Sequence, residues 1–158
     1  MLDSNRAAVS DSFTISTKAP FYGVGMDIRL TSTVFQIFAN DLQRSLEFYR
    51  LLGLPVPDPD GPPHVAVALP GGNTLSFDTE ETIAGMHPGW APPASSASRL
   101  GLALGVGAPS EVDALFEKIT SAGHSGPLKP YDAPWGQRYA TVADPDGNWV
   151  DLFAPLET

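Results

Sequence analysis

Few side chains in this sequence could hold a metal ion or act as a nucleophile. Cysteine is absent from the 158 residues, which excludes disulfides, thiolate metal ligands and cysteine nucleophiles. The 3 histidines, His64, His87 and His124, follow no spacing typical of metal ligands, so each is expected to be a solvated surface side chain. The most informative acid is Asp151, which lies inside the otherwise apolar segment WVDLF. An aspartate on the inward face of a strand costs free energy unless it is paired, hydrogen-bonded or hydrated, so Asp151 is the first candidate for a functional group.

The elements that would position Asp151 repeat along the chain. Residues 34–39 (VFQIFA) have the composition of a strand, and residues 42–52 place apolar side chains at helical spacing, with Asn40 as the expected N-cap and Gly53 as the end. The segments HVAVA and TLSFD flank a Gly-Gly-Asn turn and predict a hairpin. After a proline-rich segment the order recurs: a strand, a helix and closing strands that include YATVA and WVDLF. The repeat predicts an α+β fold of two βαβββ modules, whose eight strands form a curved mixed sheet around a cleft with the helices outside.

The chain is expected to form one domain that follows an arm. Residues 1–27 are polar and aperiodic, which predicts a flexible N-terminal arm or leader. Residues 28–158 would form the single domain, with module 1 at about 33–80, a linker at 81–98 and module 2 at about 99–155. A chain of 158 residues can bury roughly two-thirds of its unfolded surface without crosslinks.

Charge and hydropathy argue against two classes of partner. With 9 Lys and Arg against 18 Asp and Glu, the net charge of -9 opposes the phosphate neutralisation that supplies most nucleic-acid affinity. The negative electrostatic field of this net charge favours a cationic small molecule. Alternatively, the net charge only keeps the protein soluble. No apolar run approaches the roughly 20 residues that span a bilayer, and no signal-peptide pattern opens the chain. We therefore expect a cytoplasmic protein with a small-molecule ligand and with neither a nucleic-acid nor a membrane partner.

Two segments of the chain resemble a known family. The segments DLQRSLEFYRLLG at 41–53 and WGQRYATVADPDGNWVDL at 135–152 are similar, and in the same order, to signature segments of the vicinal oxygen chelate superfamily. This superfamily comprises glyoxalases, extradiol dioxygenases and bleomycin-resistance proteins, and the resemblance covers about residues 33–155. It implies the two-module fold and, in typical members, a divalent metal held by side chains that face the cleft. It implies no single chemistry, because the superfamily hosts many activities.

The metal-ligand positions of that family can be carried over one by one. The resemblance places them at Val34, Ser76, Gly101 and Asp151. Valine and glycine offer no ligand side chain, and one carboxylate with a serine falls short of the three protein ligands that a catalytic site needs. We therefore expect no metal and no cofactor, as in the metal-lacking members of the bleomycin-resistance type.

Strand alternation then assigns the remaining side chains to the two faces of the sheet. If Val34 and Asp151 face the cleft, the opposite parity is wholly apolar and includes Phe77, Val150 and Leu152, as expected beneath helices. The cleft face receives aromatic rings, a strip of small residues and a few polar groups, which is how small-molecule sites are built. Alternatively, the rings only fill space and the glycines ease sheet curvature. The candidate ligand-binding residues are Gln36, Phe38, Ser76, Gly101, Ala103, Trp135, Trp149, Asp151 and Phe153.

Three functions stay open. The first is a metal-independent binding protein of the glyoxalase/bleomycin-resistance type, which sequesters an aromatic ligand that the acidic balance allows to be cationic. The second is an enzyme of the lyase, isomerase or dioxygenase type, in which Asp151 is the candidate catalytic acid or base and Gln36 and Ser76 polarise a carbonyl. Asp151 could equally be a structural remnant held by Gln36, Ser76 or a tyrosine. The third is a structural or regulatory dimer; a homodimer, with or without exchange of modules through the linker at 81–98, is expected from the resemblance.

Overall fold

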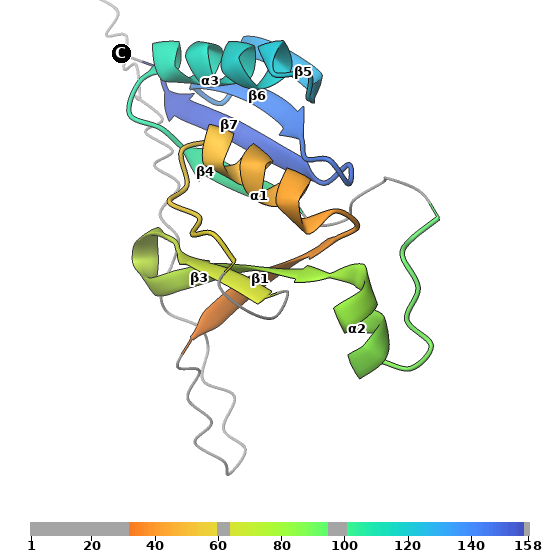
Figure 1. Ribbon diagram of the computed structural model, residues 1–158. Helices are drawn as coiled ribbons and strands as arrows, with labels where there is room; N and C mark the ends of the chain where they lie inside the picture. Colours follow the sequence, from red (N-terminus) through yellow and green to blue (C-terminus); the bar gives the residue numbers. More distant parts are fainter. Residues whose placement is uncertain (1–31, 60–63, 95–100, 157–158) are drawn as a thin grey trace, which may run out of the picture. The chain divides into compact units, whose positions relative to one another are not determined.

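The computed structural model describes residues 32–59, 64–94 and 101–156 (Figure 1). The arm predicted at 1–27 and the second part of the predicted linker, residues 95–98, lie outside the described residues.

Module 1 forms a three-stranded sheet with the order β1-β3-β2. Its elements are β1 (Thr33–Ala39), α1 (Leu42–Leu51), β2 (His64–Ala68), the short 3-10 helix η1 (Pro70–Gly72), β3 (Asn73–Thr79) and α2 (Glu80–Met86). Strands β2 and β3 pair in antiparallel fashion, which confirms the predicted hairpin, and β1 runs parallel to β3. The hairpin turn contains Gly71 and Gly72, whose φ angles of 78° and 79° favour glycine.

Module 2 repeats this arrangement with one more strand. Its elements are β4 (Leu102–Gly105), α3 (Pro109–Ser121), β5 (Ser125–Ala133), β6 (Gln137–Ala143) and β7 (Trp149–Pro155). The sheet order is β4-β7-β6-β5, with β4 parallel to β7 and the other pairs antiparallel. In both modules the first strand therefore pairs in parallel with the last, as an internal repeat requires.

The α+β architecture of two modules is confirmed, and the described residues form seven strands where the sequence predicts eight. Module 1 continues after β3 into α2, within the segment that the sequence analysis assigns to an irregular linker. The Thr79 hydroxyl accepts a hydrogen bond from the Thr82 N–H at 3.1 Å, and Glu80 and Glu81 occupy the first turn. An N-cap hydroxyl followed by acidic residues stabilises a helix start. The sequence analysis did not predict this short helix, because the prolines farther along the segment indicated an irregular linker.

The core lies on one face of each sheet. Leu75 and Phe77 of β3 are fully buried, as are Val150 and Leu152 of β7, and the same core contains Tyr49 of α1. This confirms the strand parity at these positions. Burying each large apolar side chain contributes about 1.5–3 kcal/mol, so the parity is strongly specified.

The start of α1 differs from the sequence-based expectation. The N-cap is Asp41, whose carboxylate accepts a hydrogen bond from the Arg44 N–H at 3.2 Å, and not Asn40. The Asn40 N–H instead donates to Asp146 Oδ1 at 3.3 Å. The residue before the helix is thus used to join α1 to the β6–β7 turn.

The β6–β7 turn, DPDGN, is organised around the buried carboxylate of Asp144. Its Oδ1 accepts from the N–H groups of Asp146 and Asn148, at 3.0 and 2.8 Å. Its Oδ2 accepts from the Asn148 side-chain amide at 2.9 Å and from the Tyr49 hydroxyl at 3.2 Å. Burial first, and then the charge of Asp144, raise the pKa of Tyr49 well above its ordinary value, so this phenol stays a donor. The turn therefore also anchors α1 of module 1 to module 2.

No helix in the described part of the chain is long and apolar enough to cross a membrane.

Candidate functional site

The predicted site residues of module 2 gather on the face of the β4-β7-β6-β5 sheet opposite its core. In the register of this sheet, Asp151 lies between Ala103 of β4 and Thr141 of β6. In the next row, Phe153 lies between Gly105 and Tyr139. Residues that are opposite in register share a face, so these side chains are neighbours. We call this surface the Asp151 face; its residues are Gly101, Ala103, Gly105, Tyr131, Trp135, Tyr139, Thr141, Trp149, Asp151 and Phe153.

Asp151 is half-buried at the centre of this face. Its Oδ1 accepts a hydrogen bond from the Thr141 hydroxyl at 2.7 Å. Within residues 32–59, 64–94 and 101–156, no Lys, Arg or His lies within ion-pair distance of its carboxylate. Its Oδ2 is directed toward Gly101, where an added Cβ would lie 3.9 Å away. The carboxylate is thus held by Thr141 at Oδ1, and its Oδ2 lies on the Gly101 side.

The residue that holds Asp151 is one that the sequence analysis missed. Thr141 is nearly fully buried on β6, whereas Gln36 and Ser76, two of the predicted holders, belong to the sheet of module 1. The sequence could have predicted this contact, because a tight DPDGN hairpin places Thr141 directly opposite Asp151 in an antiparallel register. Burial first, and then the neighbouring Asp151, raise the pKa of the Tyr139 phenol, which therefore stays protonated beside the carboxylate.

Aromatic rings surround the carboxylate on the Asp151 face. Trp149 and Trp135 are 52% and 58% exposed, which is unusual for tryptophan. The rings of Tyr131, Trp135 and Tyr139 stand nearly perpendicular to one another, with centroids 5.6 to 6.3 Å apart. Sequence reasoning did not single out Tyr131, and it allowed for Tyr139 only as an unnamed tyrosine that could hold Asp151. Both share the strand parity of Thr141 and Phe153 across β5, β6 and β7.

The strip of small residues on β4 is only partly open. An added Cβ at Gly105 would lie 3.0 Å from the Phe153 ring, so this ring already occupies the space above Gly105. Ala103 and Gly101 are exposed, and Gly101 has no close neighbour except Asp151. Free space next to the carboxylate is therefore found at the Gly101 end.

The predicted residues of module 1 lie on a different sheet. Gln36 of β1 is opposite Ser76 of β3 in the parallel register, and Phe38 is opposite Asp78. Ser76 is fully buried, and its hydroxyl has no hydrogen-bond partner in the part of the chain that the structure describes. Phe38 packs edge-to-face on Trp90 with ring centroids 5.8 Å apart.

The histidines are not all the solvated side chains that the sequence predicts. His64 is 56% exposed in its side chain, but its Nδ1 lies 2.9 Å from Oδ1 of the buried Asp78. His124 is half-buried, with its ring 4.9 Å from that of Phe48. Only His87 is simply exposed.

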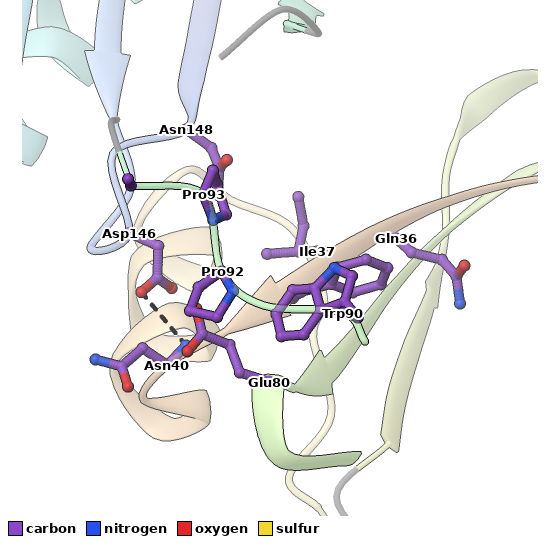
Figure 2. A pocket seen from close by; sticks show the side chains of 11 residues that line it. Gln36, Ile37, Asn40, Glu80, Trp90, Pro92, Pro93, Asp146 and Asn148 are labelled. Atoms are coloured by element: carbon purple, nitrogen blue, oxygen red, sulfur yellow. Dashed lines mark hydrogen bonds between the residues drawn. The ribbon is translucent and has the colours of Figure 1, made fainter. Parts of the chain in front are cut away.

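Three cavities divide the predicted residues among them. Gln36 and Phe38 line a cavity of about 610 Å³ (Figure 2). Gly101 and Ala103 line a second cavity of about 520 Å³, and Gln36, Gly101 and Trp149 line a small one of about 100 Å³. Neither Asp151 nor Ser76 lines any of these three cavities. The structure thus brings Trp135, Trp149, Asp151 and Phe153 together on one face. Gln36 meets Trp149 and Gly101 at the small cavity, whereas Phe38 and Ser76 line none of the three cavities together with residues of that face.

Comparison with known proteins decides the family. The model of the Glyoxalase/Bleomycin resistance protein/Dioxygenase superfamily matches residues 30–152. The chain belongs to this superfamily. No protein of curated function matches the sequence significantly.

Solved structures of the same superfamily have the same fold. A glyoxalase/bleomycin resistance protein/dioxygenase from Nocardioides is 27% identical, with a TM-score of 0.65 over 84% of this chain and 87% of that one. A glyoxalase-related enzyme from Fulvimarina pelagi is 25% identical, with a TM-score of 0.66 over 78% and 87%. A family enzyme from Burkholderia phytofirmans, 21% identical over 78% and 98%, shares the fold with a TM-score of 0.69.

The residues at the metal-ligand positions of the superfamily do not fit a metal ion. Val34 and Gly101 offer no ligand side chain, Ser76 is buried in the other sheet, and the single carboxylate of Asp151 falls short of the three protein ligands of a catalytic site. Among the described residues, no group of three or more His, Asp or Glu side chains is placed to hold a metal.

Proposed function

We propose that this chain is a metal-independent binding protein that sequesters an aromatic, cationic small molecule on the Asp151 face. One observation carries the proposal: a half-buried carboxylate with no cationic partner in the described structure stands among exposed aromatic rings. In kind, such a role is that of the bleomycin-resistance proteins in the superfamily.

The carboxylate supports a cationic ligand. Partial burial weakens the hydration of Asp151, and its neighbours Thr141 and Tyr139 are neutral donors that leave its negative charge without a cation in the described structure. A ligand cation at the open Oδ2, on the Gly101 side, would supply the missing partner at close range. The net charge of -9 adds long-range attraction for a cation and repulsion for an anion.

The rings support an aromatic ligand. Trp149 lies two residues before Asp151 on β7, so the two side chains share one face of the sheet. The Trp149 indole is half exposed, and its apolar surface is hydrated when no ligand covers it. Covering it releases that water, and a cation above an indole gains a further 0.5 to about 2 kcal/mol. A flat, positively charged molecule uses both features at once, whereas a neutral or anionic analogue does not.

Titration calorimetry with a planar aromatic cation tests this function. We expect proflavine to bind the chelator-treated protein, and neutral acridine to bind at least about tenfold more weakly, which corresponds to about 1.4 kcal/mol. Asp151→Asn removes the charge while keeping an acceptor for Thr141, and should weaken proflavine binding about tenfold with little change for acridine. Glu117→Gln, on the exposed side of α3, changes the net charge equally and is the matched control. Equal affinity of wild type and Asp151→Asn for proflavine would overturn the proposal.

A further inference from the structure

We propose a second ligand site, separate from the Asp151 face, that takes an amine with an aromatic or other apolar body. It is the cavity of about 610 Å³, a size within the range of small-molecule sites. Three segments far apart in sequence build it: β1 with Asn40, the start and exit of α2, and the β6–β7 turn (Figure 2). The lining residues are Gln36, Ile37, Phe38, Asn40, Glu80, Trp90, Pro92, Pro93, Ala94, Asp146 and Asn148.

The apolar part of the cavity is an aromatic and proline wall. The Trp90 and Phe38 rings meet edge-to-face with an interplanar angle of 86°, an arrangement that fixes both rings. Pro92 and Pro93 follow Trp90 and restrict the backbone of this loop. The wall is therefore pre-formed, which lowers the ordering cost of binding an apolar body.

The polar part of the cavity is acidic. Asp146 is half-buried: its Oδ2 accepts from the Ser45 hydroxyl at 3.2 Å and its Oδ1 from the Asn40 N–H at 3.3 Å. Glu80 lines the same cavity, and in Figure 2 its side chain and that of Asp146 both reach toward Pro92. In the described ranges, neither carboxylate forms an ion pair.

Among the described residues, the charges that act on Asp146 are those of further acids. Asp144 of the same turn and Asp41 at the start of α1 both act on it through their charges, and burial is the main reason that the pKa of Asp146 is raised. A carboxylate in such an acidic environment has no cationic partner among the described residues. The ammonium group of a ligand would supply one. The amides of Gln36, Asn40 and Asn148 add donors and acceptors that can orient such a group.

The two sites are distinct. None of the residues Trp135, Trp149, Asp151 and Phe153 lines this cavity, and neither Trp90 nor Asp146 belongs to the Asp151 face. The inference therefore does not depend on the function proposed above, and variants can separate the two.

Phenethylamine, which is an ammonium ion at neutral pH, is the probe, and phenylethanol is its neutral counterpart. Calorimetry should show saturable binding of phenethylamine at least about tenfold tighter than that of phenylethanol. Asp146→Asn and Glu80→Gln should each weaken phenethylamine binding several-fold, and Trp90→Ala should weaken both probes. Trp90→Phe keeps a ring and should retain most of the affinity, which guards against a loop that merely fails to fold. Glu117→Gln is the control for net charge.

The outcomes separate the inference from the proposed function. If Asp146→Asn and Trp90→Ala leave phenethylamine binding unchanged, the second site is wrong, whatever proflavine does. If proflavine binding is insensitive to Asp151→Asn while phenethylamine binding depends on Trp90 and Asp146, only the function of the Asp151 face is wrong.

Discussion

Three aspartates near the end of the chain show how surroundings decide what one side chain does. Asp144 is buried, and four hydrogen bonds satisfy its carboxylate, so its role is to hold the β6–β7 turn and Tyr49. Asp146 and Asp151 are half-buried with fewer donors and without a cation in the described structure. The sequence does not distinguish these roles well. Two of the aspartates lie in a polar turn and one in a strand, and in either place an aspartate can be paired, hydrated or functional.

The pH dependence of stability should reveal Asp146. Burial, followed by the charge of Asp144, raises the pKa of Asp146 in the folded state above its ordinary value near about 3.9. The folded state therefore binds this proton more tightly than the unfolded chain does. Its stabilising contribution is present below the ordinary pKa and is lost as the pH rises through the raised one.

Asp146→Asn removes this titration. We expect the unfolding free energy of Asp146→Asn, relative to wild type, to increase as the pH rises from about 3 to about 7, because only the wild type then acquires the buried charge. Urea unfolding at a series of pH values measures it. A difference between the two proteins that is constant with pH would show that Asp146 is not perturbed.

At the scale of elements, the packing of α3 on β5 depends on one glycine. An added Cβ at Gly126 would lie 2.6 Å from the Phe116 ring and 2.8 Å from Thr120 Cγ2. Gly126→Ala should therefore push α3 away from the sheet and lower the unfolding free energy by about 1–3 kcal/mol. Gly85→Ala in α2 is the control, because a Cβ there meets open space, and it should be neutral or stabilise by up to about 1 kcal/mol. Equal urea midpoints for the two variants would contradict this packing.

The elements themselves were largely predictable, and their ends were less so. Periodicity predicted α1, the β2–β3 hairpin and α3, because burial of an apolar stripe dominates their stability. It did not predict α2, which is only seven residues long and has a single buried residue, Ile83. The sequence also predicted Asn40 and not Asp41 as the N-cap, because Asn and Asp are equally good caps. Only the tertiary hydrogen bond from the Asn40 N–H to Asp146 distinguishes the two positions.

The site was predictable only within one module. Strand parity correctly placed Trp149, Asp151 and Phe153 on one face, because β7 is a regular strand with a buried opposite side. Parity cannot show which faces meet across modules: Gln36 shares a small cavity with Gly101 and Trp149, whereas Phe38 and Ser76 do not. The acidic cavity was missed because Asp146, Glu80 and Trp90 come from a turn, a helix start and a loop, which have no periodicity to read.

At the scale of the whole molecule, we propose that the protein forms a homodimer through the edge of the module 1 sheet. In the sheet that the described residues form, β1 is an edge strand, and Val34 on it is 51% exposed next to the partly exposed Phe35. Exposed apolar edge strands favour pairing with another chain, and a lysine at such an edge opposes it.

Light scattering after size exclusion should give a dimer mass for wild type and a monomer mass for Val34→Lys. Ser121→Lys on α3 adds the same charge and should stay dimeric; a monomeric wild type would refute the proposal.

The proposed function requires that Asp151 binds an aromatic cation without a metal. Proflavine titration of protein treated with a chelator, for wild type and Asp151→Asn in parallel and with metal content determined on the same samples, tests it most directly. We expect the wild type to bind equally well before and after chelation, and Asp151→Asn to bind about tenfold more weakly. Binding that disappears with the chelator and returns with zinc, or that is unchanged in Asp151→Asn, would contradict the account.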